Sequence, residues 1–143
     1  MTIVRFFLLH FYKKNIWILV SIMKTLNIVL SILFIIFAAL QYNDPDPFLW
    51  IPIYLLAAFL CWRASQGIHH RSLYIVAISI YIIYAIYLFF DNNGVISWAS
   101  EHAAESLVTS MKAEKPWIEE TREFGGLLIL IGAMLLNLFR KKP

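Results

Sequence analysis

The sequence is short of both cysteine and charge. It has one cysteine, Cys61, and only 15% of its 143 residues are Asp, Glu, Lys or Arg. A single thiol excludes an internal disulfide and any metal centre built from several cysteines. Soluble domains carry about 25% charged residues and about half apolar ones, whereas this chain is 61% hydrophobic with a mean hydropathy of +0.72. The composition excludes an ordinary soluble domain and places the chain in a lipid bilayer.

Four long apolar blocks predict membrane-spanning helices over residues 25–42, 47–65, 73–90 and 116–139. A helix of about 18 residues is roughly 27 Å long, close to the roughly 30 Å hydrocarbon core of a bilayer. No Asp, Glu, Lys, Arg or His lies near the middle of any block, which argues against the polar pathway of a transporter or channel. We therefore expect an all-α integral membrane protein, an up-and-down bundle of four transmembrane helices.

The charged residues are segregated along the chain. Nine of the twelve basic residues lie before the first span, between the second and third, or after the fourth: Arg5, Lys13, Lys14, Lys24, Arg63, Arg71, Arg140, Lys141 and Lys142. All nine acidic residues lie in the other two loops, two of them at Asp44 and Asp46 and seven in residues 91–123, called the acidic segment below. The positive-inside rule predicts a cell-membrane protein with both termini cytoplasmic. Because this distribution explains the net charge of +3, we expect no nucleic-acid partner.

Turn residues predict where helices begin and end. Asp46 followed by Pro47 is typical of an N-cap and a first helical position, and Gly67 is expected to end the same helix. Within the acidic segment, Ser97 is a candidate cap for a short helix on the outer membrane surface. The apolar stripe of that helix would consist of Trp98, Ala103, Leu107, Val108 and Met111.

Residues 1–22 have two interpretations. They mix aromatic and apolar side chains with Arg5, His10, Lys13 and Lys14, as interfacial membrane anchors do. Met23 followed by Lys24 would also serve as a translation start, which would make the extension an artefact of start-site choice. In either case the four-span membrane domain is expected over residues 23–143.

Three stretches of the sequence resemble the transmembrane protein 220 family. One is Gln41-Tyr42-Asn43-Asp44-Pro45-Asp46-Pro47, followed by Trp50 and Tyr54. Another is Lys115-Pro116-Trp117-Ile118-Glu119-Glu120-Thr121-Arg122-Glu123-Phe124-Gly125-Gly126, and Met23-Lys24-Thr25-Leu26-Asn27 opens the first span. The resemblance covers about residues 23–142 and implies a small multi-pass protein of four helices. It implies no catalytic residue and no cofactor.

Side chains on the predicted outer face form a candidate ligand or cation site. Two prolines make the turn around Asp44 and Asp46 stiff, and carboxylates are hard oxygen ligands for Ca²⁺. His102 would suit zinc. The candidate residues are Asn43, Asp44, Asp46, Trp50, His102, Trp117, Glu119, Glu120, Arg122 and Glu123. The competing interpretation makes the carboxylates helix caps and dipole partners and the tryptophans an aromatic belt.

Two classes of function stay open. The leading hypothesis is a non-enzymatic accessory or binding component whose acidic and aromatic rim contacts a ligand, a cation or a partner. The alternative is a membrane-embedded enzyme or cation-binding protein that uses Asp44, Glu120 or His102. This alternative requires these side chains to converge on one pocket. The sequence specifies no metal and no cofactor. Small residues at Gly125 and Gly132 allow a helix to approach closely, so a homo-oligomer or a protein partner at the helix faces is also expected.

Overall fold

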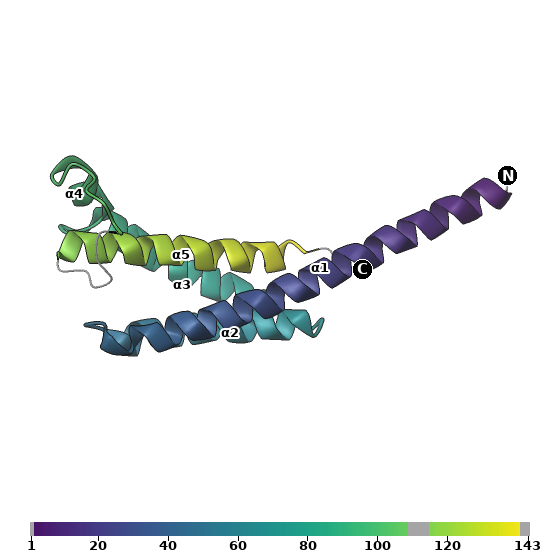
Figure 1. Ribbon diagram of the computed structural model, residues 1–143, viewed down its shortest axis with the longest axis horizontal. Coiled ribbons are helices and arrows are strands. Elements are labelled where there is room, and N and C mark those ends of the chain that lie inside the picture. Colours follow the sequence, from purple (N-terminus) through teal and green to yellow (C-terminus); the bar gives the residue numbers. More distant parts are fainter. Residues whose placement is uncertain (1, 109–114, 141–143) are drawn as a thin grey trace. The chain divides into compact units, whose positions relative to one another are not determined.

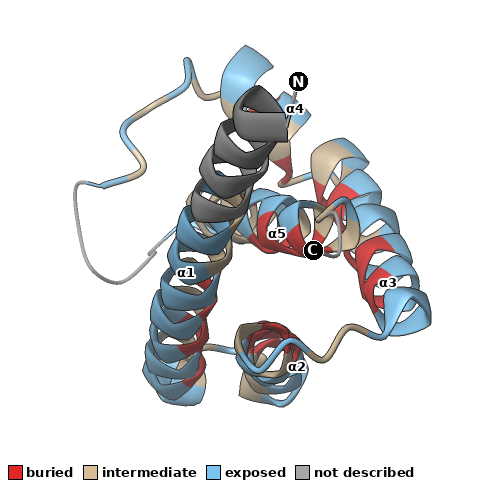
Figure 2. Cartoon of the chain, turned by 90° about the vertical axis from the view of Figure 1, so that its right-hand side faces the viewer, coloured by how far each residue is buried: buried red, intermediate tan, exposed pale blue. Residues whose placement is uncertain are grey.

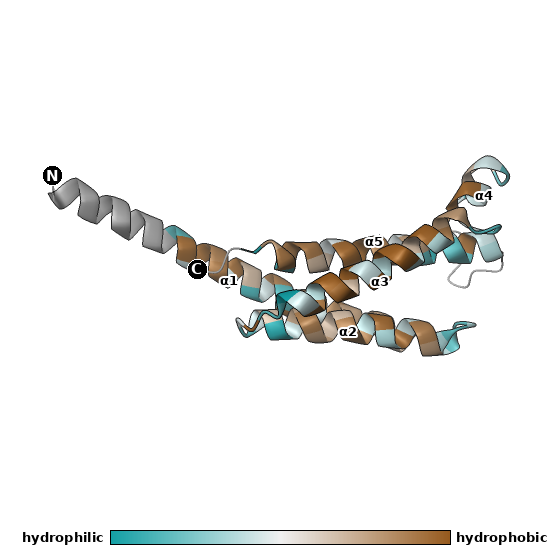
Figure 3. Cartoon of the chain, turned by 180° about the vertical axis from the view of Figure 1, so that it is seen from behind, coloured by the Kyte–Doolittle hydropathy of each residue, from teal (hydrophilic) through white to brown (hydrophobic). Residues whose placement is uncertain are grey.

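The structure, a computed structural model, is helical (Figure 1). It describes residues 2–108 and 115–140, with side chains from residue 15 onward. Those residues contain no strand, and four of their segments are long and apolar enough to cross a membrane: Asn15–Asn43, Pro47–Ser65, Arg71–Ser100 and Pro116–Leu138. Apolar residues cover the long helices and hydrophilic ones gather at the turns (Figure 3). The all-α class is confirmed, and so is the presence of four helices long and apolar enough to span a membrane.

The chain divides into two compact units, Met1–His70 with Phe139–Pro143, and Arg71–Leu138. The first unit contains α1 (Thr2–Leu40), a single 3₁₀ turn η1 (Gln41–Asn43) and α2 (Pro47–Ser65). The second contains α3 (Arg71–Phe90), α4 (Val95–Ser100) and α5 (Pro116–Leu138). Within each unit the two long helices run antiparallel (Figure 1).

Helix α1 buries one narrow face. Asn27, Ser31, Phe34 and Ala38 are buried and recur every three or four residues (Figure 2), which is the period of a helix with one packed side. The hydroxyl of Ser31 donates a 2.9 Å hydrogen bond to the carbonyl oxygen of Ala58 in α2. This bond fixes the alignment of the two helices.

Helix α1 is longer than the predicted first span. It begins at Thr2, so residues 1–22 are not separated from the span by a turn in the described range. Its 39 residues correspond to about 58 Å, roughly twice the hydrocarbon core. The helix continues because the segment has neither Gly nor Pro to interrupt it.

Gly67 ends α2 as predicted. Its φ is +77°, a left-handed conformation that glycine adopts without steric cost. Its amide donates to the carbonyl of Ala64 at 3.0 Å, and the amide of Ile68 donates to the carbonyl of Arg63 at 3.0 Å. These two bonds form a Schellman motif, which satisfies carbonyls that the end of the helix leaves without partners.

Tyrosines and small residues pack the second unit. Tyr74 and Tyr81 are each 1% exposed, so both are packing residues of α3. The ring centroids of Phe89 in α3 and Phe124 in α5 are 5.7 Å apart. The residues that α5 buries are Thr121, Leu127, Leu130, Ala133, Met134 and Asn137.

The acidic segment contains a short helix, α4, but the apolar stripe predicted there does not follow it. Helix α4 has six residues and its N-cap is Gly94, so Ser97 lies inside the helix rather than at its cap. Ala103 and Ala104 have φ of 51° and 50°, which no right-handed helix contains. The stripe predicted through Ala103 and Leu107 is therefore broken, and Met111 lies outside the described residues.

Candidate functional site

Within the acidic segment, the loop after α4 folds back onto the start of α5, and the side chain of Glu105 lies at the centre of the contacts. The Glu105 carboxylate accepts a hydrogen bond of 2.7 Å from Lys115 Nζ and one of 2.5 Å from Trp117 Nε1. The Glu105 main-chain carbonyl accepts a 2.9 Å hydrogen bond from Trp98 Nε1. His102 stacks on Trp117, with ring centroids 3.6 Å apart and planes 4° from parallel. We call these five residues the Glu105 cluster.

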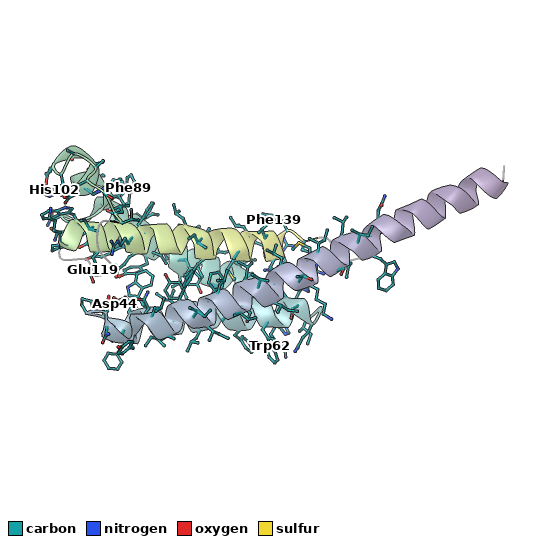
Figure 4. All side chains as sticks on the ribbon, viewed as in Figure 1. Asp44, Trp62, Phe89, His102, Glu119 and Phe139 are labelled. Atoms are coloured by element: carbon teal, nitrogen blue, oxygen red, sulfur yellow. The ribbon has the colours of Figure 1, made fainter. Side chains whose placement is uncertain are left out.

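The backbone turn after α4 positions the Glu105 cluster. Two consecutive left-handed alanines reverse the chain, and each costs about 1 kcal/mol or more in a non-glycine residue. The amide of Ala104 donates to the carbonyl of Trp98 at 3.0 Å. Figure 4 labels His102 in this turn and Glu119 on the first turn of α5. The bonds to Lys115 and Trp117 offset the strain of the turn, because they join it to the start of a long helix.

The charge on Glu105 is stabilised by its neighbours. The hydrogen bond from Lys115, and then that from Trp117, lowers the pKa of Glu105 below its ordinary value of 4.5. Lys115 also lies 5.6 Å from the ring centroid of Trp117, within reach of a cation–π contact. The carboxylate is thus ionised at neutral pH and holds a lysine and a tryptophan together.

We expect Glu105→Gln to lower the thermal stability of the protein at neutral pH. Because the folded-state pKa of Glu105 is lowered, its contribution is present above pH 4.5 and is lost as the pH falls through the folded-state value. The melting temperatures of the wild type and the variant should therefore differ at pH 7 and converge in acid. Glu101→Gln is the matched control, since Glu101 accepts a bond from the neutral hydroxyl of Ser97. A difference in melting temperature that persists in acid would show that the ion pair of Glu105 and Lys115 is not its cause.

A second polar cluster joins the end of α3 to α5. Tyr87 and Glu120 each form a side-chain hydrogen bond with Asp91, and the amide of Asn93 donates to Asp91 Oδ2 at 3.2 Å. A hydrogen bond between two carboxyl groups requires a proton on one of them. Glu120 Oε2 is buried without a hydrogen-bond partner among the described residues. This pair can hold a proton or offer oxygen ligands to a cation.

In the first unit, the turn between α1 and α2 presents Asp44 and Asp46. Asp46 is the N-cap residue of α2 and Pro47 follows it, as predicted, but the Asp46 side chain makes no capping hydrogen bond. Its main-chain carbonyl accepts from the amides of Leu49 and Trp50 instead. Partial burial, and then the neighbouring charge of Asp46, raises the pKa of Asp44 above its ordinary value of 3.8.

We expect Asp44→Asn to raise the melting temperature at neutral pH. A carboxyl group whose folded-state pKa is raised costs stability wherever it is ionised in the folded protein. The cost is absent below pH 3.8, where both the folded and the unfolded state carry a proton. The gain should therefore be measured at pH 7 and should disappear in acid, which serves as the internal control. A loss of stability at pH 7 would show instead that the carboxylate holds a cation or a donor.

Trp50 does not lie on an exposed rim. It is 1% exposed, and its ring centroid is 5.8 Å from that of Tyr54, whose ring is in turn 5.7 Å from Phe37 of α1. A belt or ligand-stacking tryptophan must present its ring to the interface or the ligand. Burial makes Trp50 a packing residue in this structure, and its membership of the candidate site stays a prediction.

The structure brings some of the predicted site residues together. His102 stacks on Trp117, and Arg122 Nε donates a 2.6 Å bond to the carbonyl of Leu107. Glu119 lies in the first turn of α5, where a negative charge was expected. Asn43 and Asp44 belong to the other unit, so one shared pocket stays a prediction. Among the described residues, no group of three or more His, Cys, Asp or Glu side chains is arranged as metal ligands.

Sequence reasoning missed the central role of Glu105 and Lys115. The signals in the sequence were weak. Lys115 is merely the first residue of the motif that runs to Gly126, and Glu105 merely stands four residues after another glutamate, Glu101. Glu105 and its lysine partner stand ten positions apart, which does not match a helical pair at three or four residues. The left-handed turn at Ala103 and Ala104 is a tertiary feature that this spacing does not reveal.

Comparison with known proteins assigns the family. Neither a curated protein nor a solved structure matches the chain. The family model described as "Transmembrane family 220, helix" matches residues 33–139, which is well over half of the chain. The match contains the turn at Asp44 and Asp46, the Glu105 cluster and α3 to α5. The chain therefore belongs to transmembrane family 220.

Proposed function

We propose that this protein is a non-enzymatic accessory component of the cell membrane whose acidic segment binds a protein partner. The observation that carries the proposal is the Glu105 cluster, in which charged and aromatic side chains are held in one arrangement before any partner arrives. Fixing such side chains on binding costs about 0.5–1.5 kcal/mol each. A cluster that is already ordered avoids that cost.

The chemistry of the acidic segment indicates the kind of partner. Residues 91–123 contain seven acidic and three basic residues, so the segment attracts a basic surface. The Lys115 and Glu105 side chains remain 49% and 32% exposed, which leaves charge available at the rim. Trp117 offers a large, rigid contact, and tryptophan is enriched among the residues that dominate binding energy.

The proposal includes a topology in which both termini are cytoplasmic and the acidic segment is outside. The concentration of Lys and Arg in the opposite loops supports it. Single cysteines at Gln66 and Val108, both exposed, test it in intact cells with a membrane-impermeant maleimide. Cys61 is buried and gives the background. We expect labelling at position 108 only, and labelling at position 66 only would reverse the orientation.

Site-specific photo-crosslinking tests the partner itself. A benzophenone side chain at Val108, which is 87% exposed, should give a discrete protein adduct in cells. The same group at Ile83, 68% exposed on α3, should give only lipid adducts. Trp117→Ala should weaken the adduct at position 108. Equal yields at both positions, or no effect of Trp117→Ala, would contradict the proposal.

Cation binding is the second candidate function, and the hydrogen-bonded pair of Asp91 and Glu120 favours it. The test is thermal unfolding with a chelator and then with Ca²⁺, Mg²⁺ or Zn²⁺. An ion that binds only the folded state adds about 2.7 kcal/mol at a hundredfold excess over its dissociation constant. A selective upward shift that Glu120→Gln abolishes would support a cation site at the pair of Asp91 and Glu120. An absence of any shift would leave the protein partner as the candidate.

A further inference from the structure

Two arginines bind at the C-terminal end of α2: Arg63 belongs to its last turn, and Arg140 bonds to the main chain of Ala64. Arg63 Nη2 lies 3.4 Å from His70 Nε2, and the Arg63 guanidinium is 6.0 Å from the ring centroid of Phe59. Arg140 Nη1 lies 3.4 Å from the carbonyl oxygen of Ala64, with which it forms a hydrogen bond. We call Arg63, His70 and Arg140 the arginine cluster.

Among the residues that the structure describes, no carboxylate pairs with the arginine cluster. The described contacts of Arg63 and Arg140 are to an imidazole, an aromatic ring and a carbonyl group, none of which carries a full negative charge. Arg63 Nε is buried and has no hydrogen-bond partner among the described residues. A guanidinium has five N–H donors, so most of the donors in this cluster remain available to an anion.

A further basic residue, Lys24 of α1, lies level with the C-terminal end of α2. The bond from Ser31 to Ala58 aligns α1 with α2, and the two helices are antiparallel (Figure 1). Lys24 stands seven residues before Ser31, and Ser65 stands seven residues after Ala58. Equal steps of about 1.5 Å per residue therefore place Lys24 level with the last residue of α2.

We propose that the arginine cluster binds the phosphate group of an anionic phospholipid. The planar fork of arginine matches the geometry of phosphate oxygens, which accept two parallel hydrogen bonds from it. The cluster lies at the end of a membrane-spanning helix, the level at which lipid headgroups lie, and basic sites at such ends bind anionic headgroups. A lipid phosphate supplies there the negative charge that the described side chains do not.

Native mass spectrometry of the full chain in detergent tests the proposal. Phosphatidylglycerol should form a 1:1 adduct that phosphatidylcholine at the same concentration does not form. Arg63→Gln and Arg140→Gln should each weaken it by roughly tenfold, as the loss of a charge-assisted hydrogen bond predicts. Arg71→Gln removes the same charge from the first residue of α3 and should leave the adduct unchanged. An equal loss in Arg71→Gln would show diffuse attraction and overturn the site.

Two further experiments, a competition with inorganic phosphate and the variant Arg63→Lys, identify the source of the phosphate and control for folding. Inorganic phosphate at millimolar concentration should neither displace the lipid nor raise the melting temperature as the lipid does. If it does both, the site takes free phosphate and the lipid assignment is wrong. Arg63→Lys keeps the charge but loses the fork, so it should fold and still bind the lipid several-fold more weakly. Full binding by Arg63→Lys would contradict recognition by the guanidinium.

Discussion

Replacing Trp50 with alanine should cost roughly 3–5 kcal/mol of stability, the range measured for large aromatic residues in packed cores. The Trp50 side chain is 1% exposed and packs beside Tyr54. Its removal leaves a cavity that the surrounding rings fill only in part. Inside a membrane protein the lost energy is mainly dispersion, because the atoms that lined the ring have no new neighbours.

The same helix supplies the matched control for Trp50→Ala. Trp62 is 48% exposed, so Trp62→Ala removes the same atoms without creating a cavity. Unfolding of both variants in mixed detergent and SDS micelles, followed by circular dichroism, would measure the difference. Trp50→Phe should recover part of the loss because it refills most of the volume. Similar losses in Trp50→Ala and Trp62→Ala would contradict the assignment of Trp50 to the core.

Gly94→Ala should lower stability by roughly 1–3 kcal/mol, the usual cost of forcing extra atoms into a packed site. A Cβ at this position would lie 1.9 Å from the carbonyl oxygen of Leu88 and 3.2 Å from the amide nitrogen of Asp91. Both atoms belong to the backbone at the end of α3, so they cannot turn away as a side chain can. The end of α3 or the start of α4 must move instead.

Gly132→Ala is the control for this substitution. A Cβ at Gly132 meets no atom within 4 Å, and alanine is the better helix former by about 1 kcal/mol. We expect its melting temperature to equal or exceed that of the wild type, whereas Gly94→Ala melts lower. Because Gly94 precedes the Glu105 cluster, Gly94→Ala should also change the fluorescence of Trp98 or Trp117. An unchanged melting temperature would show that the turn adapts without cost.

The sequence predicted features that depend on local chemistry. The four spans follow from hydropathy alone, and Gly67 follows from the left-handed residue that a helix end requires. The position of Asp46 at the start of α2 was also predicted, since Pro47 favours a first helical residue. The role of its side chain was not, because a capping bond depends on a rotamer that neighbouring residues select.

Features that depend on distant contacts could not be predicted. Alanine is the best helix former, yet Ala103 and Ala104 are left-handed in a turn that Glu105 ties to Lys115 and Trp117. Trp50 stands at the boundary of a span, where belt tryptophans are common. Its burial follows from the packing around Tyr54, which no local pattern reveals. The candidate site was therefore predicted as a set of residues and not as an arrangement.

The pairing of helices within each unit has a consequence for biogenesis. The second and fourth candidate spans are less apolar than the first and third, so each is the weaker candidate for insertion on its own. α2 follows α1 after a turn of only residues 41–46 and is bonded to it through Ser31. The less apolar second span is therefore synthesised directly after the more apolar first span, with which it shares a hydrogen bond. Integration of the first unit can then proceed as one hairpin rather than as two independent segments.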